Sequence, residues 1–223
     1  MYRSGHSYSR PDFLMDHEVV FVTFNYRLGV FGFLSTEDDV VPGNNGLKDQ
    51  VLALEWVRDN VASFGGNPGS VTITGLSAGG ASVHLHYFSP LSRGLFQRGF
   101  SQSGVGLNPF TIQEEPLMRA KKLGAAVGCP SSSTRGLVEC LKQRPAKHIL
   151  SKIGSFFSYG FLPCIPFGPV VEQAGSRPFL ATDPYILLKN GQVYDVPWLV
   201  STTSHEGLFL VNSKYSRLKY SRF

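Results

Sequence analysis

A serine enclosed by small residues, Gly75-Leu76-Ser77-Ala78-Gly79, leaves few folds open to this chain. A β-branched run, Val71 to Thr74, precedes the segment, and an apolar stretch with helical character, Ala81 to Tyr87, follows it. The G-x-S-x-G pattern is common by chance, but between a strand and a helix it is typical of a strained turn that lifts a serine hydroxyl clear of a sheet. Gly80 allows the strand and the helix to pack closely. The pattern therefore predicts a strand-turn-helix unit with Ser77 at its tip.

The rest of the chain alternates between predicted strands and helices. Val19 to Phe24 is a near-continuous β-branched and aromatic run, which is typical of a strand buried on both faces of a parallel sheet. Apolar residues from Leu47 to Val61 recur every three or four positions and predict an amphipathic helix. We expect further strands at 98–101 and 196–202, helices at 111–127 and 137–150, and an aromatic-rich loop at 156–169. This alternation predicts an α/β fold with a mostly parallel central sheet flanked by helices.

Charge and hydropathy narrow the possible functions. The net charge of +5 comes mostly from a basic tail, residues 212–223, because residues 1–211 hold 17 basic and 16 acidic side chains. That balance predicts no nucleic-acid-binding face. No apolar run approaches the roughly 18 residues that a membrane-spanning helix needs, so no membrane span is predicted. The first residues show no secretory signal, and the tail is consistent with a truncated or misread end.

Five segments occur in a characteristic order and spacing along the chain: Asn25-Tyr26-Arg27-Leu28-Gly29, Gly43-Asn44-Asn45-Gly46-Leu47-Lys48-Asp49-Gln50, Phe64-Gly65-Gly66-Asn67-Pro68, Gly75 to Gly80 and Gln102-Ser103-Gly104. In these segments the sequence resembles the type B carboxylesterases and cholinesterases, and most closely their insect esterase branch. The resemblance covers almost the whole chain. It implies a partial α/β-hydrolase domain over residues 1–211, incomplete at both ends. It also implies a serine esterase that cleaves carboxylic esters through an acyl-enzyme.

The resemblance assigns roles to individual residues. Ser77 is the expected nucleophile, and the Ala78 backbone N–H is the expected oxyanion donor, in a turn formed with Gly75, Gly79 and Gly80. Ser204-His205-Glu206-Gly207 looks like the family segment that carries the triad acid, which makes Glu206 the expected acid. Asp195 and Glu172 remain the alternatives for that role. His205 is expected to be a loop neighbour rather than the base.

Two parts of the expected machinery are missing from this sequence. No histidine matches the family's catalytic base, and no glycine-rich oxyanion loop precedes the matched segments. His84 and His86, on the helix after the serine, are expected to be packing or surface residues. Removing the base of a serine triad costs on the order of 10⁶ in kcat, so the 223-residue chain alone is expected to be inactive.

The substrate hypothesis depends on Leu76 and on the aromatic loop. In cholinesterases the residue before the nucleophile is a glutamate that attracts a cationic choline, and Leu76 lacks that charge. Together with Phe156, Phe157 and Phe161, Leu76 suggests a pocket for an uncharged ester. The alternative is that these aromatic side chains are simply core residues.

The chain has three cysteines, an odd number that leaves reduced thiols and a small disulfide loop both open. The family resemblance implies that Cys129 and Cys140 pair, and a disulfide favours a secreted or extracellular protein over a cytoplasmic one. No cluster of His, Cys and acidic residues has metal-ligand spacing, so neither a metal nor an organic cofactor is predicted.

The leading hypothesis is thus a carboxylic ester hydrolase in fragment form. The alternative is a non-catalytic, protein-binding adhesion module of the cholinesterase type, but such proteins commonly lose the serine that Ser77 retains. A further alternative is an inactive short isoform that binds esters without turnover.

Overall fold

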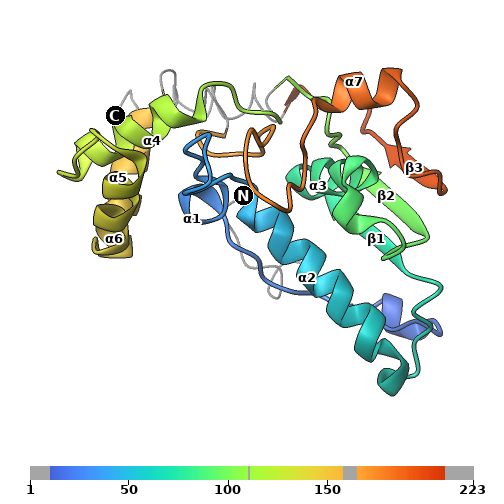
Figure 1. Cartoon of the computed structure of the whole chain (residues 1–223). Coiled ribbons are helices and arrows are strands. Elements are labelled where there is room, and N and C mark those ends of the chain that lie inside the picture. The colour runs from blue at the N-terminus through green and yellow to red at the C-terminus, as the bar shows by residue number, and fades with distance from the viewer. Residues whose placement is uncertain (1–10, 110, 158–164, 209–223) are drawn as a thin grey trace, which may run out of the picture.

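The computed structural model describes residues 11–109, 111–157 and 165–208 (Figure 1). The predicted basic tail, residues 212–223, lies outside them. The described chain contains three strands and seven α-helices. The strands are β1 (Thr72–Leu76), β2 (Arg98–Gln102) and β3 (Trp198–Ser201). The helices are α1 (Gly29–Phe33), α2 (Asn45–Asn60), α3 (Ala78–Phe88), α4 (Pro116–Ala126), α5 (Thr134–Lys142), α6 (Ala146–Lys152) and α7 (Pro184–Lys189).

The three strands form one parallel sheet in the order β1-β2-β3, which confirms the expected parallel arrangement. Gly75 pairs with Ser101, and Ser101 pairs with Val200, so the carboxyl ends of all three strands lie at the same edge. Helix α3 connects β1 to β2 and packs on one face of both strands (Figure 1). On β1 the exposed side chains alternate with half-buried ones, because only one face is covered among the described residues.

The segment Val19 to Phe24 is not a strand, contrary to the sequence prediction. It has no regular secondary structure, and Val19 and Phe24 are 49% and 39% exposed. No described strand pairs with it, since β1 pairs only with β2. An apolar run of this kind is stable as a buried strand only where neighbouring strands supply hydrogen bonds and cover its faces.

The helix expected at 137–150 is divided into α5 and α6 at Pro145. Proline has no backbone N–H and disfavours helical geometry in the residue before it, so α5 ends near Gln143 and Pro145 caps the next helix. The expected helix at 111–127 begins later than predicted, at Pro116. By contrast, α2 and α3 span the segments in which helices were expected.

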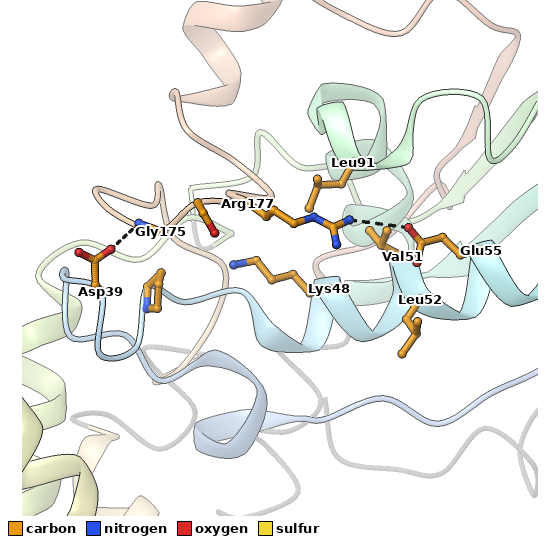
Figure 2. Close-up of a pocket in the computed structure, with 10 residues that line it drawn as sticks. Asp39, Lys48, Val51, Leu52, Glu55, Leu91, Gly175 and Arg177 are labelled. Carbon is orange, nitrogen blue, oxygen red and sulfur yellow. Dashed lines mark hydrogen bonds and ion pairs between the residues drawn. The ribbon is translucent and has the colours of Figure 1, made fainter.

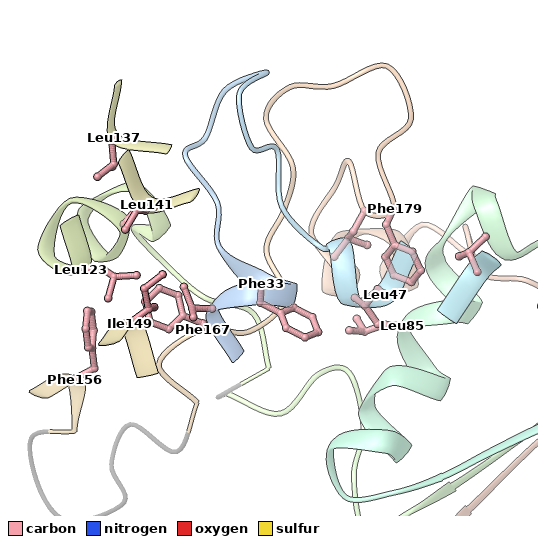
Figure 3. Packing of buried hydrophobic residues seen from close by; sticks show 14 of the residues in the cluster. Phe33, Leu47, Leu85, Leu123, Leu137, Leu141, Ile149, Phe156, Phe167 and Phe179 are labelled. Carbon is pink, nitrogen blue, oxygen red and sulfur yellow. The ribbon is translucent and has the colours of Figure 1, made fainter. Parts of the chain in front are cut away.

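One apolar cluster extends from helices α2 and α3 to helices α4 and α5 (Figure 3). Leu47 of α2, Leu85 of α3 and Phe179 pack at one end, and Leu123 of α4 and Leu137 of α5 pack at the other. Cys129 and Cys140 form the disulfide that the family resemblance implied, and it ties the start of the α4–α5 connection to α5.

Candidate active site

Ser77 occupies the tight turn between β1 and α3, as the sequence predicts. Its φ and ψ of 56° and −117° are unfavourable for a residue with a side chain. The conformation is held from both sides, since the Ser77 N–H donates to the Gln102 carbonyl at 2.7 Å and the Ser77 carbonyl accepts from the Ala81 N–H at 2.9 Å. Ser77 is exposed at the carboxyl edge of the sheet. A strained, exposed serine at this position is the geometry expected of a nucleophile elbow.

Close backbone contacts make the turn possible. A Cβ on Gly75 would overlap the backbone of Gly79, and a Cβ on Gly104 would overlap the Ser77 carbonyl. A Cβ on Gly80 would lie 2.7 Å from the Gly104 carbonyl oxygen. Gly79 differs, because a Cβ there would meet no described atom within 4 Å. Gly75 and Gly80 therefore allow the close packing expected from sequence, and Gly104 adds a third contact that sequence analysis did not assign.

Ala78 is the first residue of α3, so its backbone N–H has no partner within the helix. The Ala78 carbonyl accepts a hydrogen bond from the Ser82 hydroxyl at 3.0 Å, one turn further along. The positive end of the helix dipole lies at this turn, where it favours negative charge. The Ala78 N–H is therefore available as an oxyanion donor beside Ser77.

Glu206 lies on the exposed segment that follows β3. Its pKa is lowered chiefly by a hydrogen bond from the Ser103 side chain and next by the Thr203 N–H, which donates to Oε1 at 2.8 Å. Ser103 follows β2, has a φ of 49°, and donates its own N–H to the Ser201 carbonyl at 2.8 Å. Ser103 thus connects Glu206 to the strand beside the elbow. Sequence analysis missed it, although it belongs to the matched segment Gln102-Ser103-Gly104.

The two alternative acids lie in other surroundings. Glu172 is buried, and its Oε1 accepts hydrogen bonds from Asn44 Nδ2 at 2.9 Å and from the Phe179 N–H at 2.8 Å. Its Oε2 pairs with Lys48 Nζ at 2.5 Å. Asp195 is exposed before β3 begins. Among the described residues neither has a hydrogen bond to Ser103, whereas Glu206 does.

His84 and His86 are buried on α3 and have packing roles. His86 Nδ1 and Nε2 lie 2.7 Å from Ser92 Oγ and 2.9 Å from Gln50 Oε1, and His84 Nδ1 accepts from the Gly106 N–H at 3.1 Å. Burial lowers the pKa of His84 to about 4 and that of His86 to about 3. His205 Nδ1 lies 2.8 Å from Ser204 Oγ. Across the described ranges, no hydrogen bond joins Ser77 to a histidine ring.

The residues suggested for a substrate pocket separate in the structure. Leu76 is 51% exposed beside Ser77. Phe156 belongs to the core, where its ring lies 5.2 Å from that of Phe167 and beneath Lys122 Nζ. Phe157 is half-buried next to it, and Phe161 lies outside the described residues. The structure thus gives Phe156 the core role that sequence analysis left open as the alternative.

A surface hollow of about 560 Å³ lies elsewhere, between α2 and the loop around Gly175 (Figure 2). Arg177 Nη2 approaches Glu55 Oε1 at 3.8 Å across it, and the Gly175 N–H donates to Asp39 at 2.9 Å. Its lining includes neither Ser77 nor Glu206. Within the described part of the chain, no group of three His, Cys, Asp or Glu side chains could hold a metal ion, and no helix is long and apolar enough to cross a membrane.

Comparisons with known proteins agree with this geometry. Residues 1–222 match the model of the carboxylesterase family. Venom carboxylesterase-6 of Apis mellifera is 54% identical over 195 residues, which cover 87% of this chain and 35% of that protein. Juvenile hormone esterase of Tribolium castaneum is 43% identical over 215 residues, or 92% of this chain and 36% of that protein.

Esterase FE4 of Myzus persicae is 47% identical over 199 residues, which cover 89% of this chain and 35% of that protein. The chain therefore spans about a third of the length of these curated relatives. The parallel sheet flanked by helices, with Ser77 in the turn after β1, is the corresponding part of an α/β-hydrolase fold. The chain belongs to the carboxylesterase family.

Proposed function

We propose that this protein hydrolyses carboxylic esters through an acyl-enzyme formed on Ser77. The observation that carries the proposal is the strained backbone of Ser77 in an exposed turn between a parallel strand and a helix. A backbone conformation this costly persists only where the surrounding structure enforces it, and such positions cluster at functional sites. The carboxylesterase relatives support ester hydrolysis as the reaction class.

The geometry supports a distribution of roles. The Ser77 hydroxyl adds to the ester carbonyl carbon, its proton passes to an imidazole base, and that base returns the proton to the departing alcohol oxygen. The oxygen that becomes negative accepts from the Ala78 N–H. Glu206, held ionised by Ser103 and Thr203, orients the base and stabilises its cation. The described residues do not place a base at Ser77, so we assign that role to a histidine outside them.

Added imidazole provides a direct test, because Ser77 is exposed and a free imidazole can reach it. Without imidazole, the 223-residue chain should hydrolyse p-nitrophenyl butyrate no faster than the Ser77→Ala variant. With imidazole, rapid quenching and mass spectrometry should find a butyryl group on the peptide that contains Ser77. Heat-unfolded chain serves as the control. Failure of the folded chain to acylate Ser77 faster than its other serines would contradict the proposal and favour a binding module.

We further propose that the ester is uncharged. Leu76 exposes hydrocarbon immediately before the nucleophile, and apolar surface there favours a neutral group over a quaternary ammonium. With added imidazole, Ser77 should be acylated faster by a neutral butyrate ester than by butyrylcholine. The Leu76→Glu variant should reduce the ratio of these two acylation rates. A wild-type protein that is acylated faster by butyrylcholine would rule out an uncharged ester as the preferred substrate.

We also propose that the protein is located outside the cell. The Cys129–Cys140 disulfide and a relative named as a venom carboxylesterase support an extracellular location. When the protein is isolated from its source in the presence of an alkylating agent, Cys129 and Cys140 should stay unmodified, because their sulfur atoms are already paired.

A further inference from the structure

The Trp198 side chain connects β3, the strand that leads to Glu206, with helix α3. Its ring stacks on His84 with centroids 4.1 Å apart and an interplanar angle of 26°. Tyr87, also on α3, donates its hydroxyl to the carbonyl of Pro197 at 2.8 Å. Gly99 makes room for this contact, because a Cβ there would lie 2.5 Å from the Tyr87 hydroxyl. The start of β3 is therefore fixed against one side of α3.

A chain of two hydrogen bonds continues from Trp198 to the serine turn. Trp198 Nε1–H donates to Ser101 Oγ at 3.0 Å, and the Ser101 hydroxyl donates to the Gly80 carbonyl at 2.8 Å. Ser101 is fully buried in the middle of the sheet, on β2. Gly80 lies three residues after Ser77, in the first turn of α3. These two hydrogen bonds thus connect the strand that leads to the proposed acid, through the central strand β2, with the helix that carries the proposed oxyanion donor.

The Ser101 hydroxyl accepts from the indole and donates to the carbonyl at once, and an alanine in its place could do neither. Gly80 is part of α3, and its carbonyl also accepts this hydrogen bond from β2. The bond therefore holds the first turn of α3 against β2. Ser77 and the Ala78 N–H belong to that same turn. Displacing reacting groups by about 1 Å can cost on the order of 10²-fold in rate.

We propose that Ser101 and Trp198 are positioning residues of the esterase site, which hold the turn of Ser77 and Ala78 in register with the strand that leads to Glu206. The inference rests on the proposed function, since positioning has meaning only for a reacting Ser77. It adds two residues that contact neither the substrate nor the reacting atoms. Neither was assigned a role from the sequence.

The test measures Ser77 acylation by p-nitrophenyl butyrate in the 223-residue chain at a fixed imidazole concentration. Ser101→Ala should lower the limiting acylation rate roughly 10- to 100-fold and leave the half-saturating ester concentration unchanged. Trp198→Phe keeps a ring to stack on His84 but lacks the indole donor, and it should lower the same rate. The indole N–H NMR signal of Trp198 should shift in Ser101→Ala, and that of Trp56 should not.

The matched control is Ser92→Ala, which removes another fully buried hydroxyl, bonded to His86 at the far end of α3. It should destabilise the fold and leave the acylation rate of the folded protein unchanged. If Ser101→Ala and Trp198→Phe both acylate at the wild-type rate, the positioning role is wrong although the proposed function stands. If wild-type Ser77 does not acylate, the proposed function fails and this inference fails with it.

Discussion

Gly75 and Gly79, two of the three glycines of the serine turn, differ in whether they tolerate a side chain. A Cβ on Gly75 would overlap Gly79 and force β1 and α3 apart, whereas a Cβ on Gly79 would enter open space. Gly75→Ala should therefore destabilise the protein by about 1–3 kcal/mol. Gly79→Ala should stabilise it by about 0.5–1 kcal/mol, because alanine loses less backbone entropy than glycine in a helix. Urea unfolding of both variants measures these two changes in stability. Equal changes in the two variants would contradict the predicted difference between Gly75 and Gly79.

Among single residues, the sequence predicts those whose role depends on a local motif. Ser77 and Ala78 are identified by a turn that needs small neighbours within a few positions. Ser101 and Ser103 are not identifiable in that way, because their partners, Trp198 and Glu206, lie about a hundred residues along the chain. Their roles exist only once β2 and β3 pair.

Helix α3 carries two buried histidines that should make stability depend on pH. Burial keeps His84 and His86 neutral in the folded state, with pKa values of about 4 and 3, whereas an unfolded histidine titrates near 6.5. Between about pH 6.5 and 4 the unfolded chain binds more protons. The free energy of unfolding should therefore fall as the pH is lowered through this window, by up to about 1.4 kcal/mol per pH unit for each histidine.

Urea unfolding at several pH values measures this slope. His86→Gln keeps a polar side chain beside Ser92 and Gln50 and should reduce the slope by about half. His148→Gln, on the exposed surface of α6, should leave it unchanged. A wild-type stability that stays constant from pH 6.5 to 4 would show that the α3 histidines are not neutral in the fold.

A helix or strand is predictable from sequence when the pattern that stabilises it lies within its own segment. Helix α2 buries a stripe that its own periodicity creates, so its position follows from sequence. Helix α3 is instead buried at every residue from Gly80 to Phe88. The run Val19 to Phe24 has the composition of a strand but lacks a described neighbour to pair with. Strand formation depends on the partner as much as on the residues, and composition carries no information about that partner.

The molecule as a whole is held together by contacts between distant segments, and Glu172 is central to them. Its buried carboxylate accepts hydrogen bonds from Asn44 at the start of α2 and from the Phe179 N–H, and it pairs with Lys48. Asn44 in turn exchanges hydrogen bonds with the Val170 backbone at 2.7 and 2.9 Å. The bonds made by Asn44 and Lys48 join segments more than 120 positions apart in the chain. This buried cluster therefore explains why Glu172 is structural rather than available as a triad acid.

Replacing Glu172 by glutamine should be among the costly single changes in the core. The glutamine can still accept from Asn44 and Phe179, but Lys48 loses its carboxylate while 26% of its side chain remains exposed. Removing one partner of a buried ion pair costs about 3–5 kcal/mol, and the partial exposure of Lys48 places this pair at the lower end. Glu139→Gln, in the exposed pair with Lys142, should cost far less, because exposed ion pairs contribute little to stability.

Urea unfolding of the two variants tests whether burial or charge pairing alone sets the cost. Adding Lys48→Met to Glu172→Gln should recover part of the lost stability, since it removes the charge that the glutamine leaves unpaired. The same double variant should leave the Cys129–Cys140 disulfide formed, because that bond lies in the α4–α5 part of the core. If Glu172→Gln costs no more than Glu139→Gln, the link between α2 and the 170–180 segment depends on its hydrogen bonds and not on the buried charge.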